Sequence, residues 1–162
     1  MLKVVSKSSP LIHLGKIGLL DLLTEQFDQI LVPRAVWQEA VEEGGDEPDA
    51  KAIASASWIR VQDVPPSQLL TTLLALLDRG EAEAIVLAME IGADLILLDE
   101  SDARNIAKFY NLRKTGLLGV LIKAKRQGRI QSLKVYLEQL RNTGFHLSEQ
   151  VCNEVLEAVS EK

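Results

Sequence analysis

The stretch DRGEAEAIVLAMEIGADLILLDESD, residues 78–102, decides the fold of this chain. Its first part has the spacing of a capped helix that stops at Gly92, and the apolar run Asp94–Leu98 that follows reads as a short buried strand. A cluster of carboxylates, within residues 99–102, follows at the point where that strand should end. In open α/β sheets, ligands bind beyond the carboxyl ends of the strands. The stretch therefore predicts a parallel strand that presents acidic groups to a ligand.

The length and composition of the chain indicate one domain with a core of aliphatic side chains. The chain has 162 residues, of which 47% are hydrophobic and only 4% are aromatic. No apolar run reaches the roughly 18 residues that a membrane span needs, and no leader-like segment is recognisable, so we expect a cytoplasmic protein. The single cysteine, Cys152, lies in a helical pattern and is expected to be a small buried hydrophobe.

The charge of the chain is unevenly distributed. The net charge is −5, which taken alone argues against a nucleic-acid binder. Residues 103–141, however, hold ten basic residues against one acid, a net charge of +9, so the rest of the chain carries −14. A basic third on an acidic protein is typical of a surface for phosphate or for an acidic partner segment. A set of solvated helix faces is the alternative interpretation.

Short apolar strands alternate with helices along the rest of the chain. We expect strands near residues 2–6, 30–32, 58–61, 94–98 and 112–115, and helices within 11–27 and at 34–43, 49–55, 67–77, 80–91, 102–110, 117–127, 131–141 and 148–158. This alternation predicts a mostly parallel sheet of four to five strands, covered by helices on both faces. We expect one domain over residues 1–162, with the helices at about 117–160 as a basic or oligomerisation extension.

Several carboxylates could converge at one end of such a sheet. Glu39, Glu81 and Asp99 would supply oxygen ligands of the kind that suits Mg²⁺ or Mn²⁺, and no zinc-like set of histidines and cysteines occurs. Each acid also has a purely structural explanation. Asp78 and Glu81 have the spacing of a capping box, and Asp99 could start the next helix.

Several short motifs occur in the order found in PIN domains. They are VVSKSSPLI (residues 4–12), VP (32–33) leading to Val36 and Glu39, GEAEAI (80–85), LLDE (97–100), LLGVL (117–121) and GFHLS (144–148). Over nearly its whole length the chain is similar to PIN domains, especially to the bacterial and archaeal subgroup that resembles the toxin half of type II toxin–antitoxin pairs. The resemblance implies a three-layer α/β/α fold.

The resemblance also implies a metal-dependent ribonuclease, in which carboxylates hold Mg²⁺ or Mn²⁺ that activates water against a phosphodiester. The acids at the matching positions are Glu39, Glu81 and Asp99, with Glu83, Glu100 and Asp102 as further candidates. The partners implied are RNA, a small antitoxin protein and a second copy of the chain in a homodimer. We expect Lys7, Ser8, Lys123 and Arg126 to contribute to RNA binding.

One position departs from the family pattern. Lys7 stands after the first strand, where PIN domains have an aspartate or, in this subgroup, often an asparagine. Three outcomes are open: Lys7 turns away and Ser8 or a backbone carbonyl replaces the ligand, Lys7 takes over the metal's charge by gripping phosphate, or the metal site is weak or lost. The alternative function is therefore a degenerate PIN module that binds RNA or protein without cutting. A receiver-like or nucleotide-binding domain is disfavoured, because no acid pair follows the first strand and no glycine-rich phosphate loop occurs.

Overall fold

The computed structural model describes residues 2–99 and 101–161, with the backbone alone at residues 101 and 102. Its strands form one five-stranded sheet in the order β3-β2-β1-β4-β5, and all four neighbouring pairs are parallel. The strands are β1 (Val4–Ser6), β2 (Ile30–Pro33), β3 (Ile59–Gln62), β4 (Leu95–Leu97) and β5 (Lys114–Thr115). The parallel sheet predicted from the alternation of strands and helices is confirmed.

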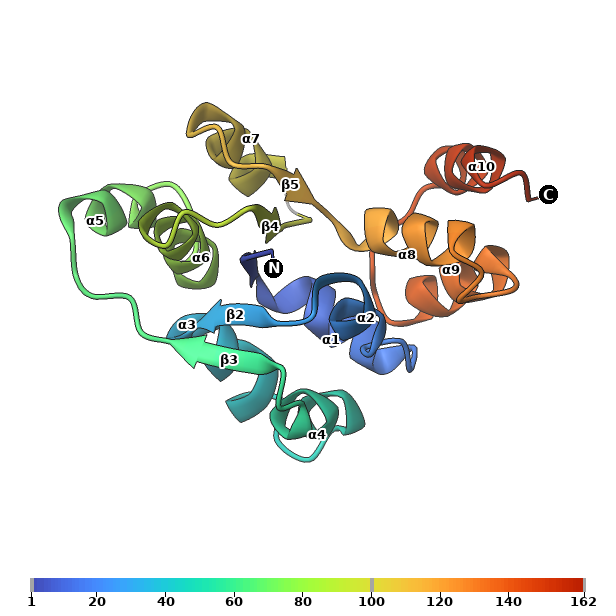
Figure 1. The fold of residues 1–162 in the computed structure, drawn as a ribbon, viewed down its shortest axis with the longest axis horizontal. Coiled ribbons are helices and arrows are strands. Elements are labelled where there is room, and N and C mark those ends of the chain that lie inside the picture. The colour runs from blue at the N-terminus through green and yellow to red at the C-terminus, as the bar shows by residue number, and fades with distance from the viewer. Residues whose placement is uncertain (1, 100, 162) are drawn as a thin grey trace.

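Helices connect the strands and complete the chain after β5 (Figure 1). They are α1 (Ser8–Lys16), α2 (Leu22–Phe27), α3 (Arg34–Trp37), the π-helical segment η1 (Gln38–Glu42), α4 (Pro48–Ser55), α5 (Gln68–Leu74), α6 (Arg79–Glu90), α7 (Ser101–Phe109), α8 (Leu117–Arg126), α9 (Leu133–Asn142) and α10 (Glu149–Ala158). None of the helices in the described part of the chain combines the length and the apolar character that crossing a membrane requires.

The strands send alternate side chains into two separate cores, one on each face of the sheet. Val4 and Leu97 belong to one buried cluster, whereas their chain neighbours Val5 and Ile96 belong to the other. Successive side chains of a strand point to opposite faces, so each cluster marks one face. Helices α5, α6 and α7 cover the second face, and α1, α2, α4 and the C-terminal helices cover the first. The fold is therefore a three-layer α/β/α arrangement, as the resemblance to PIN domains implied.

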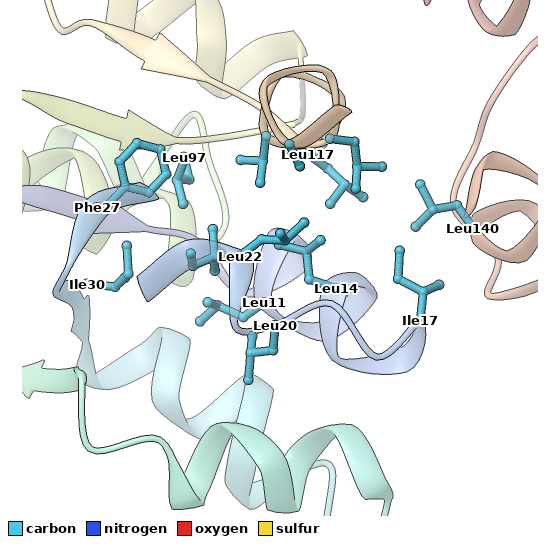
Figure 2. Close-up of a cluster of buried hydrophobic side chains, with 14 of the residues drawn as sticks. Leu11, Leu14, Ile17, Leu20, Leu22, Phe27, Ile30, Leu97, Leu117 and Leu140 are labelled. Carbon is cyan, nitrogen blue, oxygen red and sulfur yellow. The ribbon is translucent and has the colours of Figure 1, made fainter. Parts of the chain in front are cut away.

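The larger core joins the C-terminal helices to the sheet. Figure 2 shows Leu11 and Leu14 of α1 packed among Phe27 of α2, Leu117 of α8 and Leu140 of α9. Apart from Phe27 at 6%, each of these side chains is at most 1% exposed. Burial of this extent holds α8 and α9 against α1, and so fixes the position of the N-terminus of α8 beside the end of β4.

Candidate functional site

The order of the strands creates a crevice between β1 and β4. From β1 the chain builds β2 and β3 toward one edge of the sheet, and it then returns to build β4 and β5 on the other side of β1. Ser6 pairs with Leu97, and the Lys7 N–H donates to the Leu97 carbonyl at 3.1 Å. Such a switch point is where open α/β sheets bind ligands beyond the strand ends. The residues that follow these two strands are Lys7 and, two positions after Leu97, Asp99.

Lys7 does not turn away from the acids. Its side chain is buried, and its Nζ lies 3.7 Å from Asp78 Oδ2 and 3.7 Å from Glu81 Oε2. Lys7 is the residue directly before α1, so its backbone is fixed between β1 and the helix. The first of the three outcomes for Lys7, an ammonium group turned out of the site, is not what the structure shows.

Glu81 has two roles at the start of α6. The capping box predicted from the sequence is confirmed: Glu81 N–H donates to Asp78 Oδ1 at 2.8 Å, and Asp78 N–H donates to Glu81 Oε1 at 3.3 Å. The other carboxylate oxygen of Glu81 faces Lys7. Burial raises the pKa of Glu81, and the positive charge of Lys7 partly opposes that rise. Helix capping and contact with the cation are therefore compatible in one side chain.

Glu39 reaches the same place from η1. Ser8 Oγ donates to Glu39 Oε2 at 2.9 Å, and the other oxygen lies so near α6 that a Cβ atom added to Gly80 would come within 2.2 Å of it. Burial raises the pKa of Glu39, while the hydrogen bond from Ser8 and the charge of Lys7 lower it. The structure thus brings together Glu39, Glu81, Lys7 and Ser8, four of the site residues predicted from the sequence.

Glu83 lies on a different side of α6. It accepts a hydrogen bond from Ala35 N–H at 3.1 Å, and its second oxygen is 3.2 Å from Nη1 of Arg79. These contacts tie the start of α3 to α6. Among the other candidates, Glu100 lies outside the described residues, as does the side chain of Asp102.

Asp99 sits at the N-terminus of α8. Its Oδ1 accepts a hydrogen bond from Leu117 N–H at 2.9 Å, and a Cβ atom added to Gly116 would come within 2.6 Å of that oxygen. Gly116 is thus required for the close approach of Asp99 to the helix. Asp99 therefore contacts the start of α8, which lies 18 positions further along the chain.

The two basic residues predicted on α8 lie at the opposite end of that helix. Arg126 lies nine positions after Leu117, which is about 13 Å along a helix. Lys123 Nζ lies 5.5 Å from the centre of the Phe27 ring, and an Arg126 Nη donates to the Ala158 carbonyl at 3.2 Å. The structure therefore does not bring Lys123 and Arg126 to the acids.

A cleft next to Asp99 contains residues that the sequence did not indicate as site residues. Its volume is about 420 Å³, and its lining includes Arg104, Lys114, Phe145 and His146 as well as Asp99. In the sequence, Arg104 and Lys114 stand out only as two members of the basic third. The helical or strand periodicity of a sequence does not indicate which cations line a cleft. Asp78 was similarly assigned to helix capping alone. Its contact with Lys7 spans 71 positions and leaves no local signal.

The acid cluster as arranged does not fit Mg²⁺ or Mn²⁺. Two unit charges at about 4 Å interact by roughly 4 kcal/mol at an effective dielectric constant near 20, so the ammonium of Lys7 would repel a dication by roughly 8 kcal/mol. Among the side chains described, at residues 2–99 and 103–161, no group of three or more His, Cys, Asp or Glu is arranged to hold a metal ion. The carboxylates of Asp78 and Glu81 instead face the Lys7 ammonium.

Comparison with known proteins places the chain in a family. Residues 3–161 match the family described as PIN domain, which is nearly the whole chain. No curated protein matches the sequence. The match agrees with the parallel sheet, with its two helical layers and with the acids beside β1 and β4. PIN domains are nuclease-type modules that commonly bind RNA and generally use Mg²⁺ or Mn²⁺. The chain belongs to the PIN-domain family.

Proposed function

We propose that this chain is a PIN module that binds RNA without cutting it, and that the Lys7 ammonium stands where a catalytic metal ion would act. One observation carries the proposal: Lys7 Nζ lies 3.7 Å from a carboxylate oxygen of both Asp78 and Glu81. A buried ammonium next to these acids offsets one of their negative charges from within the chain. That positive charge reduces the repulsion between the carboxylates and an RNA phosphate without a divalent ion.

The RNA part of the proposal is supported by the family and by charge. PIN domains commonly bind RNA, and the strand order places a switch point, where open α/β sheets bind ligands, between β1 and β4. Residues 103–141, with their net charge of +9, include the cations that line the cleft beside Asp99. A toxin role in a toxin–antitoxin pair would require cleavage, so the proposed function does not include it.

Metal-dependent ribonuclease activity is the competing function. It is supported by the positions of Glu39 and Glu81. Their carboxylates both lie at the N-terminus of α6. A lysine has a long flexible stem, so movement of Lys7 toward solvent or toward a bound phosphate would leave these two carboxylates facing the crevice. The two functions differ in one measurable property, the affinity of the wild-type chain for a divalent ion.

Titration of Mn²⁺ into the protein by calorimetry separates the two functions. We expect no binding by wild type below millimolar Mn²⁺, and measurable binding by Lys7→Asp, which removes the cation and adds a carboxylate. Lys51→Asp, on the exposed surface of α4, makes the same change of charge far from the crevice and should behave as wild type. Micromolar binding by wild type that Glu81→Gln abolishes would overturn the proposal.

A labelled single-stranded RNA supplies the second measurement. We expect wild type to bind a fluorescein-labelled U12 oligonucleotide in EDTA, and to leave it uncut when Mn²⁺ is added. Cleavage by wild type that is lost in Glu81→Gln and in Asp99→Asn would establish the ribonuclease instead. Absence of binding to U12 at low salt would remove the RNA-binding function.

A further inference from the structure

We propose that the cleft beside Asp99, lined by Arg104, Lys114, Leu118, Phe145 and Val151, binds one nucleotide of a single-stranded RNA; this rests on the proposed function. Its phosphate would lie between the two cations and its base against the apolar wall. The volume of about 420 Å³ is within the usual range of small-ligand pockets, which is about 300–1,000 Å³. The cleft opens beside Asp99, the residue that borders the switch-point crevice on the β4 side.

The charges of the cleft favour an anion. Arg104 and Lys114 face a single carboxylate, Asp99, among the described residues of the lining, and one oxygen of that carboxylate already accepts a hydrogen bond from the N-terminus of α8. An Arg104 Nη atom lies 3.5 Å from the position a Cβ would take on Gly116, so the guanidinium lies beside the start of α8. A guanidinium and an ammonium together suit a phosphodiester, which offers two non-bridging oxygens.

Four other cations of the basic third contact other groups of the same chain. The contacts are Lys125 with Glu161, Arg129 with Glu25, Arg126 with the Ala158 carbonyl and Arg141 with the Leu147 carbonyl. These four residues hold α8, α9 and α10 to one another and to α2. Within the basic third, Arg104 and Lys114 are the cations that line the cleft next to the site.

Part of the lining of the cleft is apolar and suits a base. Phe145 lies between α9 and α10, and its ring is held by an edge contact with the His13 ring at a centroid distance of 5.2 Å. Leu118 and Val151 continue the same wall. A base can reach a wall of this kind only when it is not stacked in a helix, so the geometry selects single-stranded RNA over duplex.

Binding of U12 RNA in EDTA, measured by fluorescence anisotropy, tests the cleft. We expect the double variant Arg104→Gln, Lys114→Gln to raise the Kd at least tenfold, and the dependence of log K on log salt to become shallower by about 0.7, the contribution of one phosphate contact with a single strand. The matched control Lys51→Gln, Arg60→Gln removes two exposed charges at the β3 side of the sheet and should stay within twofold of wild type.

Two further comparisons complete the test. Phe145→Leu should raise the Kd for U12 at least fivefold, because it removes the aromatic surface for the base. A blunt RNA hairpin should bind wild type at least tenfold more weakly than U12. Thermal unfolding checks that each variant is folded, and Lys114→Gln alone replaces the double variant if that one is not.

The outcomes separate this inference from the proposed function. If wild type binds U12 and the cleft variants bind as well as the control variant, the cleft is not the nucleotide site, while the RNA-binding function stands. If wild type fails to bind U12, both fail. If wild type binds Mn²⁺ and cuts U12, the non-cleaving function fails, and a tenfold loss in the cleft variants still supports the nucleotide site.

Discussion

Lys7 Nζ lies 3.7 Å from Glu81 Oε2, and both side chains are more than nine-tenths buried. A carboxylate in such a place is stable as an anion only while a cation accompanies it. The first residue after β1 therefore supplies the cation that accompanies Glu81. In this chain the compensating charge is covalently part of the protein, so it cannot be removed by a chelator.

Replacing Lys7 by methionine should destabilise the protein in a pH-dependent way. We expect a loss of about 2 kcal/mol in the free energy of unfolding at pH 7, because the variant leaves the buried Glu81 without its cation. The pKa of Glu81 is already raised by burial, and it rises further without Lys7. The folded variant therefore holds a proton that the unfolded chain has released, so its stability falls as pH rises above about 4.5 and recovers as pH is lowered.

Urea denaturation of Lys7→Met and of wild type at pH 7 and pH 5 checks this prediction. Lys51→Met, which removes an exposed ammonium of α4, should change the free energy of unfolding by less than about 0.5 kcal/mol at either pH. An equal loss in Lys7→Met at both pH values would show that Glu81 does not depend on Lys7.

Gly80→Ala should have opposite effects in two backgrounds. In wild type the new Cβ would come within 2.2 Å of Glu39 Oε1, so the end of the Glu39 side chain must move away from Ser8. The lost hydrogen bond costs about 1–2 kcal/mol, which exceeds the gain of up to about 1 kcal/mol in helix propensity. In a Glu39→Ala background nothing has to move, and the same substitution should stabilise.

A double-mutant cycle measured by urea denaturation reports the coupling between Gly80 and Glu39. We expect a coupling free energy of at least about 1 kcal/mol. Gly92→Ala is not a suitable control because Gly92 has a positive φ, whereas Ser67→Ala tests a helix cap remote from Glu39 and should show no coupling with Glu39→Ala. Additive effects of Gly80→Ala and Glu39→Ala would contradict the close approach.

The elements around the site could be predicted because their signals are local. The capping box at Asp78 and Glu81, the apolar run of β4 and the proline in the first turn of α1 each specify structure within a few residues. The place of Lys7 could not be predicted in this way. The direction of the Lys7 side chain depends on Asp78, which is 71 positions away in the sequence. A flexible four-carbon side chain also produces no periodic pattern in the sequence that would indicate its direction.

The same limit explains the basic third of the chain. The sequence shows that cations are frequent in and after α8, but the partners of Lys125, Arg126 and Arg129 come from α2 and from the end of α10. A long-range ion pair and a solvated helix face have the same sequence pattern. Only the packing of α10 onto α8 and α9 distinguishes the cations that pair with other groups of the chain from those that line the cleft.

Glu161→Gln should weaken the attachment of the chain's C-terminal end. The Glu161 carboxylate accepts hydrogen bonds from the N–H groups of Leu133 and Lys134, so it caps α9 from outside that helix. Burial acts to raise the pKa of Glu161, but these hydrogen bonds, with those from Ser132 and Lys125, outweigh it and lower the pKa to about 2. Loss of a helix cap costs about 0.5–2 kcal/mol, which we expect at pH 7.

The pH dependence of this effect has a definite sign. The unfolded chain takes up a proton on Glu161 near pH 4.5, whereas the folded chain does so only near pH 2, so the stabilisation is present above pH 4.5 and is lost as pH falls toward 2. Thermal unfolding of wild type and Glu161→Gln should therefore differ most at pH 7 and less at pH 3. Glu157→Gln, an exposed change on α10, should differ from wild type at neither pH. A constant difference would refute the prediction.

The two ends of α8 should contribute unequally to RNA binding. Lys123→Gln, Arg126→Gln and Arg104→Gln, Lys114→Gln each remove two positive charges, so a difference in U12 affinity between these double variants reports position and not net charge. We expect the first pair to change the Kd less than threefold, because Arg126 is engaged with the Ala158 carbonyl at the end of α8 remote from Asp99. Hydrogen exchange should instead be faster near residues 156–161 in that variant. A larger loss of affinity from Lys123 and Arg126 than from Arg104 and Lys114 would place the RNA on the C-terminal end of α8, as the charge pattern of the sequence first predicted.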